Sequence, residues 1–200
     1  MDLEQLITAV GLLGVFAIVF AESGLLIGFF LPGDSLLFTA GLLVATGVLE
    51  VPLIVLLVGC FASAVAGDQV GYAFGRRVGP RLFRRPDSRF FRQEHIERAA
   101  GFYKRYGSRT IVLARFIPIV RTFAPILAGV GRMHYRTFVT YNVLGGLLWA
   151  VGVTLLGYLL GSQFPGIEQY LLPTVLLIVI VSAMPPILEL LRHWRVRANR

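Results

Sequence analysis

The sequence predicts that residues 1–200 form one all-α polytopic membrane domain, in which transmembrane helices surround two inverted, Pro-broken re-entrant hairpins that face each other. Of the 200 residues, 56% are hydrophobic and 15% are charged, and the mean hydropathy is +0.74, whereas soluble domains carry about 25% charged residues. Residues 137–167 and 169–188 contain no Asp, Glu, Lys or Arg, and about 20 apolar residues cross a bilayer. The few charges inside apolar runs, such as Asp34 and Arg115, stand near helix breakers.

The first half of the chain predicts one helix, one hairpin and one span. The helix is expected at residues 3–21. Residues 23–49 predict the first re-entrant hairpin, because the apolar arms on either side of Pro32 and Gly33 are too short to cross a bilayer. Such backbone is tolerated at membrane depth where protein or a water-filled cavity surrounds it. The next span is expected at residues 51–75.

Residues 76–109 form a basic loop with eleven Lys or Arg and three Asp or Glu. Excess Lys and Arg in short loops marks the cytoplasmic side, so we expect this loop and the basic tail at residues 189–200 to be cytoplasmic. Between residues 89 and 104, apolar and charged residues have the spacing of an amphipathic helix on the membrane surface. Anionic lipids explain the basic charge, so we expect no nucleic-acid partner.

The second half of the chain predicts another hairpin and two spans. The hairpin covers residues 110–131, broken at Pro118 and again at Pro125, and the spans cover residues 137–161 and 170–188. Counted from a cytoplasmic N-terminus, the first hairpin opens to the outside and the second to the cytoplasm. Paired interrupted segments of opposite topology are the best sequence pointer to a transporter site at the middle of the bilayer.

Two arginines lie within the second predicted hairpin. Arg115 and Arg121 stand three residues on either side of Pro118, and a guanidinium inside a bilayer costs about 2.5–3.5 kcal/mol on insertion scales. If Pro118 is the tip, the two guanidiniums converge on one spot, where their planar forks of donors suit a phosphate head group. The alternative is that each arginine reaches the interface or pairs with an acid for structural reasons.

Three acids interrupt the other apolar runs, and we expect them to couple transport to protons. They are Glu22, Asp34 and Asp68. A low dielectric disfavours the charged carboxylate, so a buried acid can exchange protons near neutral pH. Asp34 has an alternative role as a helix N-cap. Asp68 lies among glycines spaced for close helix packing, which does not account for its charge.

Other chemistries find no support in the sequence. Cys60 is the only cysteine, the three histidines are far apart, and Trp149 is interpreted as a packing residue. The sequence contains no phosphate-binding loop and no dinucleotide fingerprint, so energy would come from a gradient. We therefore expect no enzymatic activity, no cofactor and no metal.

Several short motifs occur in a fixed order along the chain. They are Glu22; Phe30-Leu31-Pro32-Gly33-Asp34; Gly67-Asp68 with Tyr72 and Gly75-Arg76; Arg115-Phe116-Ile117-Pro118 with Arg121; and Ala128-Gly129, Met133, Arg136, Phe138, Tyr141-Asn142 and Gly145. Together they resemble the DedA family, the bacterial branch of the SNARE-associated or VTT-domain membrane proteins. The resemblance covers residues 22–149.

The resemblance implies a multi-pass protein of the bacterial inner membrane with two facing re-entrant hairpins. Family members are implicated in membrane homeostasis that depends on the proton motive force, and in returning undecaprenyl phosphate across the membrane. Their eukaryotic relatives scramble phospholipids. By motif, Glu22 and Asp34 match the essential acids of the family, and Arg115 and Arg121 match its essential arginines.

These observations favour a transporter, or flippase, for a lipid that bears a phosphate, of the undecaprenyl phosphate or phospholipid class. Its partners would be membrane lipids and protons, and a homo-oligomer is left open. One alternative is a proton-coupled antiporter of small cations, in which the arginines only balance charge. The other is a membrane scaffold without transport, whose buried charges form structural ion pairs.

Overall fold

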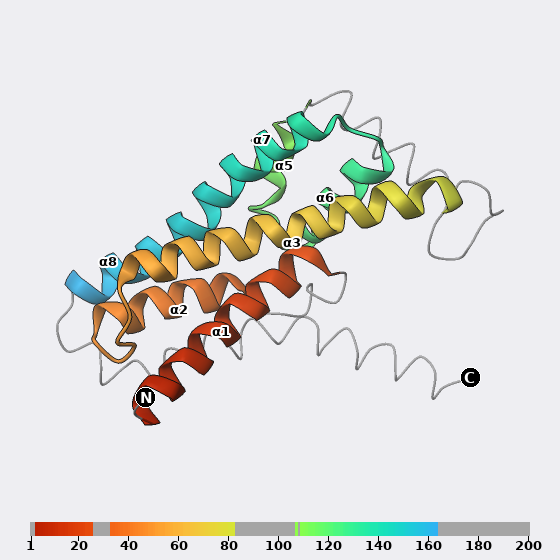
Figure 1. Cartoon of the computed structure of the whole chain (residues 1–200). Helices are drawn as coiled ribbons and strands as arrows, with labels where there is room; N and C mark the ends of the chain where they lie inside the picture. Colours follow the sequence, from red (N-terminus) through yellow and green to blue (C-terminus); the bar gives the residue numbers. More distant parts are fainter. Residues whose placement is uncertain (1–2, 26–32, 83–106, 108, 164–200) are drawn as a thin grey trace, which may run out of the picture.

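The structure is a computed structural model that describes residues 3–25, 33–82, 107 and 109–163. All regular elements in these residues are helical (Figure 1). They are α1 (Leu3–Gly24), α2 (Gly33–Ala45), α3 (Leu53–Leu82), α5 (Thr110–Ala114), α6 (Pro118–Val130), α7 (Tyr135–Gly146), the π-helical turn η2 (Leu147–Val151) and α8 (Gly152–Gln163). The predicted amphipathic helix, Pro32, the span at 170–188 and the tail at 189–200 lie outside the described residues.

Two helices are long and apolar enough to cross a membrane. One is Leu53–Val78 within α3, and the other is Tyr135–Gln163, where α7, η2 and α8 continue into one another. They run antiparallel, since Tyr72 stacks on Phe138 at 4.4 Å between ring centroids while the earlier Val65 accepts a hydrogen bond from the later Asn142. Both correspond to predicted spans, and α3 continues to Leu82, into the predicted basic loop.

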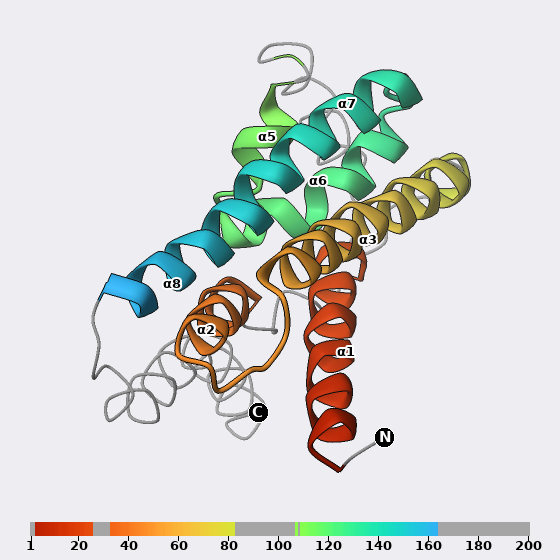
Figure 2. The ribbon, with the colours of Figure 1, turned by 60° about the vertical axis from the view of Figure 1, so that its left-hand side comes forward.

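Helix α1 runs in the same direction as α3 and ends about halfway along it (Figures 1 and 2). Phe16 lies against Gly59, and Gly24 lies against Gly67, where an added Cβ would stand 2.6 Å from the Gly67 carbonyl oxygen. These small residues allow the two backbones to touch. Counting the spans from a cytoplasmic N-terminus predicted that α1 and α3 run antiparallel. In the structure they run parallel. Helix α1 also continues past residue 21, through Glu22.

The short helix α2 packs along α8, and the two run in the same direction. Gly157 of α8 lies against the backbone of Phe38, and Gly161 lies against Ala45 one to two turns later. The predicted N-cap at Asp34 is wrong, because α2 begins at Gly33 and Asp34 is already inside its first turn. There the carboxylate faces the positive end of the helix dipole.

The short helix α6 packs along α3, again in the same direction. Gly71 lies against Pro125, and Gly129 lies against Arg76. The chain breaks at residues 115–117, so Pro118 is the first residue of α6, where a proline lacks no hydrogen bond. The second predicted break is wrong, because α6 continues through Pro125, whose ring is buried against α3.

The directions of α2 and α6 are therefore opposite, because α2 follows α8, α6 follows α3, and α8 and α3 are antiparallel. Their N-terminal ends meet near the middle of α3, and their C-terminal ends point to opposite ends of the molecule (Figure 2). Apolar side chains such as Val58 and Leu156 remain more than half exposed on the two long helices, at 56% and 62%. An apolar surface of this kind suits contact with lipid.

Candidate functional site

Arg121 joins three separate segments of the chain. It lies in the first turn of α6, and its Nη1 donates to Oδ1 of Asp34 at 2.6 Å while its Nη2 donates to Oε1 of Glu22. Glu22 comes from the end of α1 and Asp34 from the start of α2. The Glu22 side chain is 2% exposed and that of Arg121 is 10% exposed. One guanidinium therefore bridges two acids where the two short helices meet.

Trp149 is a further member of this site. Its indole Nε1 donates to the same Oδ1 of Asp34 at 2.5 Å, and the Arg121 guanidinium carbon lies 4.7 Å from the centroid of its ring. Such an arrangement is a cation–π contact. Trp149 lies in η2, and single π-helical turns inside α-helices often mark functional sites. Its interpretation as a packing residue was therefore incomplete.

Arg115 forms a second cluster beside the first. Its Nη2 donates to Oδ2 of Asp68 on α3 and to Oδ1 of Asn142 on α7. The Asn142 amide in turn donates from Nδ2 to the backbone carbonyl of Val65 at 3.2 Å, which fixes which way its oxygen points. Arg115 is 5% exposed and Asp68 is 6% exposed, so the pair is buried. A buried pair of this kind is costly to break, because either partner alone would be an uncompensated charge.

The two clusters meet at Trp149. The Arg115 guanidinium carbon lies 5.9 Å from the centroid of the indole ring over which Arg121 lies. The two guanidinium carbons are therefore no farther apart than the sum of those two distances. The two guanidiniums are neighbours, but each pairs with different acids. The structure therefore shows the arginines paired with acids, which was the alternative interpretation, and not two guanidiniums open to a phosphate.

The charges and hydrogen bonds of the site are not balanced. Three carboxylates, Glu22, Asp34 and Asp68, face two guanidiniums. Among the described residues, Oε2 of Glu22 and the Nε atoms of both arginines are buried and have no hydrogen-bond partner. Buried polar atoms without hydrogen-bond partners are energetically costly. The carboxylate oxygen could receive a proton, and the two Nε donors could bind an anion.

Two glycines make room for these side chains. A Cβ at Gly33 would overlap the Glu22 carboxylate, and a Cβ at Gly145 would stand 2.8 Å from Cδ of Arg115. A side chain at either position would therefore displace Glu22 or Arg115 from the place it has in the site. Among the residues that the structure describes, no three His, Cys, Asp or Glu side chains are grouped so that they could hold a metal ion.

Comparisons with known proteins identify a family for this sequence. Residues 31–159 match the VTT domain. The chain is 43% identical to the protein DedA of Escherichia coli K12 over 185 residues, which are 92% of this chain and 84% of that protein. It is 46% identical to the uncharacterized membrane protein Rv0364 of Mycobacterium tuberculosis over 93% of this chain and 81% of that one.

A more distant relative is the inner membrane protein YqjA of Escherichia coli K12, which is 35% identical over 84% of this chain and 76% of its own length. No solved structure matches the chain. The family model covers more than half of the sequence, and the relatives are named as membrane proteins. The chain therefore belongs to the DedA family of VTT-domain membrane proteins.

Proposed function

We propose that this protein is a transporter, or flippase, that moves a phosphate-bearing lipid of the undecaprenyl phosphate or phospholipid class across the inner membrane, coupled to protons. The observation that carries the proposal is the bridge from Arg121 to Glu22 and Asp34, where α2 and α6 meet. The donors of that bridge are the ones a phosphate would use, because guanidinium forks bind carboxylates and phosphates in the same way.

Phosphate and carboxylate would therefore compete for Arg121. A phosphate that binds the guanidinium displaces Glu22 or Asp34, and the displaced carboxylate is then a negative charge beside a negative ligand in a buried site. Taking up a proton removes this repulsion and the cost of an unpaired buried charge. Phosphate binding and proton binding would thus favour each other, so the phosphate-bearing lipid and a proton would be transported together.

The backbone around the site supports the same proposal. The N-terminal ends of α2 and α6 approach each other halfway along α3, and helix N-termini carry partial positive charge that favours anions. With α1 and α5 as their first arms, α2 and α6 would form the two inverted re-entrant hairpins. A head group could pass between the hairpins while its apolar chain stays in lipid.

The charge count favours a second candidate, a proton-coupled antiporter of small cations. Three carboxylates against two guanidiniums leave one negative charge, which a proton or a small cation could neutralise in turn. In that mechanism Arg115 and Arg121 only balance charge, so any cationic side chain should serve.

The test is translocation of a fluorescent phosphate-bearing lipid in proteoliposomes, with and without a pH gradient. The proposal predicts transport that the gradient accelerates, and loss of that acceleration in Asp34→Asn. Arg136→Gln is a matched control, because it removes an exposed arginine outside the site. Transport of cations without lipid transport would favour the antiporter. Absence of both lipid and cation transport by the folded, unaltered protein would favour the scaffold.

A further inference from the structure

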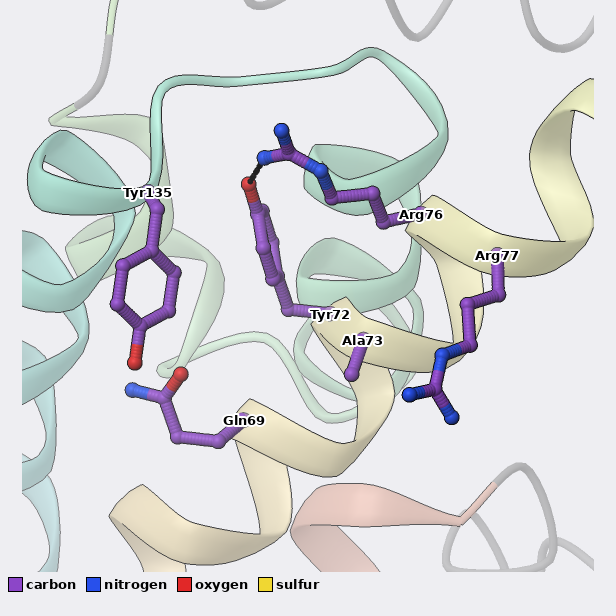
Figure 3. A pocket seen from close by; sticks show the side chains of 6 residues that line it. All are labelled: Gln69, Tyr72, Ala73, Arg76, Arg77 and Tyr135. Carbon is purple, nitrogen blue, oxygen red and sulfur yellow. Dashed lines mark hydrogen bonds between the residues drawn. The ribbon is translucent and has the colours of Figure 1, made fainter.

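A second basic site lies near the C-terminal end of α3, away from the Arg121 bridge (Figure 3). It is a pocket of about 560 Å³. Five of its lining residues come from α3 and one from the start of α7: Gln69, Tyr72, Ala73, Arg76, Arg77 and Tyr135. Two of the six are arginines and none is acidic, so the lining carries a net positive charge.

Tyr72 is a closely packed part of the pocket wall, and it orients Arg76. Tyr72 is 3% exposed and stacks on Phe138, and its hydroxyl donates to the carbonyl of Met133 at 2.6 Å. Arg76 donates from Nη1 to the Tyr72 hydroxyl at 2.7 Å, and its guanidinium carbon lies 6.0 Å from the centroid of that ring. This contact uses one of the five N–H donors of the guanidinium.

Arg77 adds a second guanidinium from the same helical turn. In Figure 3, Arg76 reaches toward the phenol of Tyr72, whereas the guanidinium of Arg77 lies on the other side of Ala73 and points away from that of Arg76. Both arginines are exposed, and neither forms an ion pair with an acid among the described residues. Arg115 and Arg121 differ from them, because Nη atoms of both already donate to carboxylates. Within the part of the chain that the structure describes, the pocket therefore presents charged donors that no carboxylate occupies.

The position of the pocket indicates what kind of ligand can reach it. Phe74 and Val70, on the same stretch of α3, are 48% and 43% exposed, so apolar surface adjoins the basic lining. Asp68, Tyr72 and Arg76 follow one another at intervals of four residues, which puts them on one face of α3. The rise from Asp68 to Arg76 is about 12 Å. The pocket thus lies between an apolar flank and the Asp68–Arg115 pair.

We propose that this pocket binds the phosphate head group of an anionic lipid, with Arg76 as the ligand of the phosphate and Arg77 as a second positive charge in the lining. The acyl chains lie along the apolar flank of α3, beside Phe74. The idea that the transported lipid occupies this pocket before it is moved rests on the proposed function. Binding of an anionic lipid to the pocket does not depend on that function. A phosphate there is held by charge-assisted hydrogen bonds, which are the strong ones for oxyanions.

The experiment uses a photo-crosslinking amino acid at Ala73 in the full chain, reconstituted in nanodiscs of phosphatidylcholine with or without phosphatidylglycerol. We expect crosslinks to phosphatidylglycerol in preference to phosphatidylcholine. The same amino acid at Val58, an exposed position of α3 outside the lining, is the matched control and should show no such preference. Equal crosslinking to both lipids at Ala73 would overturn the proposal.

Two sets of variants complete the test. The double variant Arg76→Gln/Arg77→Gln should lower the preference for phosphatidylglycerol about tenfold or more, because it removes two charged hydrogen-bond donors, whereas Arg136→Gln should leave it unchanged. If the double variant does not fold, crosslinking with Arg77→Gln alone provides the measurement. Arg121→Lys must retain the crosslink even where it abolishes transport, which separates this proposal from the proposed function. An unchanged preference in the folded arginine variants contradicts the proposal.

Discussion

Replacing Arg121 by lysine tests whether the fork of the guanidinium matters or only its charge. In the structure, one side chain donates to Glu22 and to Asp34 from two different nitrogens. A lysine ammonium is a single point of charge on a flexible stem, so Arg121→Lys is expected to keep one of these contacts and lose the other. The substitution conserves charge, and insertion scales penalise both residues similarly, so the protein should still enter the membrane.

The size of the effect follows from which contact is lost. A hydrogen bond to a charged group contributes about 1.5–3 kcal/mol, and each 1.36 kcal/mol corresponds to a factor of about ten in rate. The Asp34 side chain is 48% exposed and the Glu22 side chain is 2% exposed, so loss of the Asp34 contact should fall at the low end of that range and loss of the Glu22 contact at the high end. We therefore expect transport to fall about ten- to a hundredfold.

The assay is the initial rate of lipid translocation in proteoliposomes under a fixed pH gradient. Arg136→Lys is the matched control, since Arg136 is exposed and lies outside the site. A rate in Arg121→Lys within twofold of the unaltered protein would refute the phosphate role and favour the cation antiporter. The same would follow if Arg121→Lys/Asp34→Asn restored a rate that Arg121→Lys had lost.

Three further predictions concern the same site and its setting. Trp149→Phe keeps the ring beside Arg121 but removes the donor to Asp34, so translocation should fall about tenfold; an unaltered rate would mean that this hydrogen bond is not used. Gly33→Ala should lower the melting temperature measured by scanning fluorimetry, because the methyl group overlaps the Glu22 carboxylate, whereas Gly152→Ala, with open space around it, should not; equal melting temperatures would argue against the close contact. A cysteine at Arg136 should react with a membrane-impermeant maleimide only from the cytoplasmic side and one at Val48 only from outside, without background from the buried Cys60; the reverse pattern would invert the orientation.

Much of the helical framework could be predicted from the sequence, because its signals are local. Apolar length predicts the two long helices, and Pro118 predicts the break before α6. Glu22, Asp34, Arg115 and Arg121 stand out because a charge in an apolar run is costly wherever it lies. The prediction failed for the direction of α1, which packs parallel to α3 through Gly24 and Gly67, because hydropathy carries no information about direction.

The partners within the site could not be predicted, because they are distant in sequence. Arg121 pairs with residues 99 and 87 positions away, and Trp149 donates to an acid 115 positions away. An indole or an amide carries no charge, so neither Trp149 nor Asn142 stands out in the sequence as the ionisable residues do. The single signal for Asn142 was its place beside Tyr141 in a family motif, and the motif does not indicate what Asn142 does.

Proton uptake on phosphate binding tests the central claim most directly. A water-soluble, short-chain isoprenyl phosphate is added to purified protein in weakly buffered detergent with a pH-indicator dye. If phosphate displaces a carboxylate from Arg121, the protein should take up about one proton for each ligand bound. The ligand's own protonation is subtracted with a Glu22→Gln/Asp34→Asn variant, in which the uptake should vanish. Saturable binding with no net uptake, or with proton release, would contradict the account.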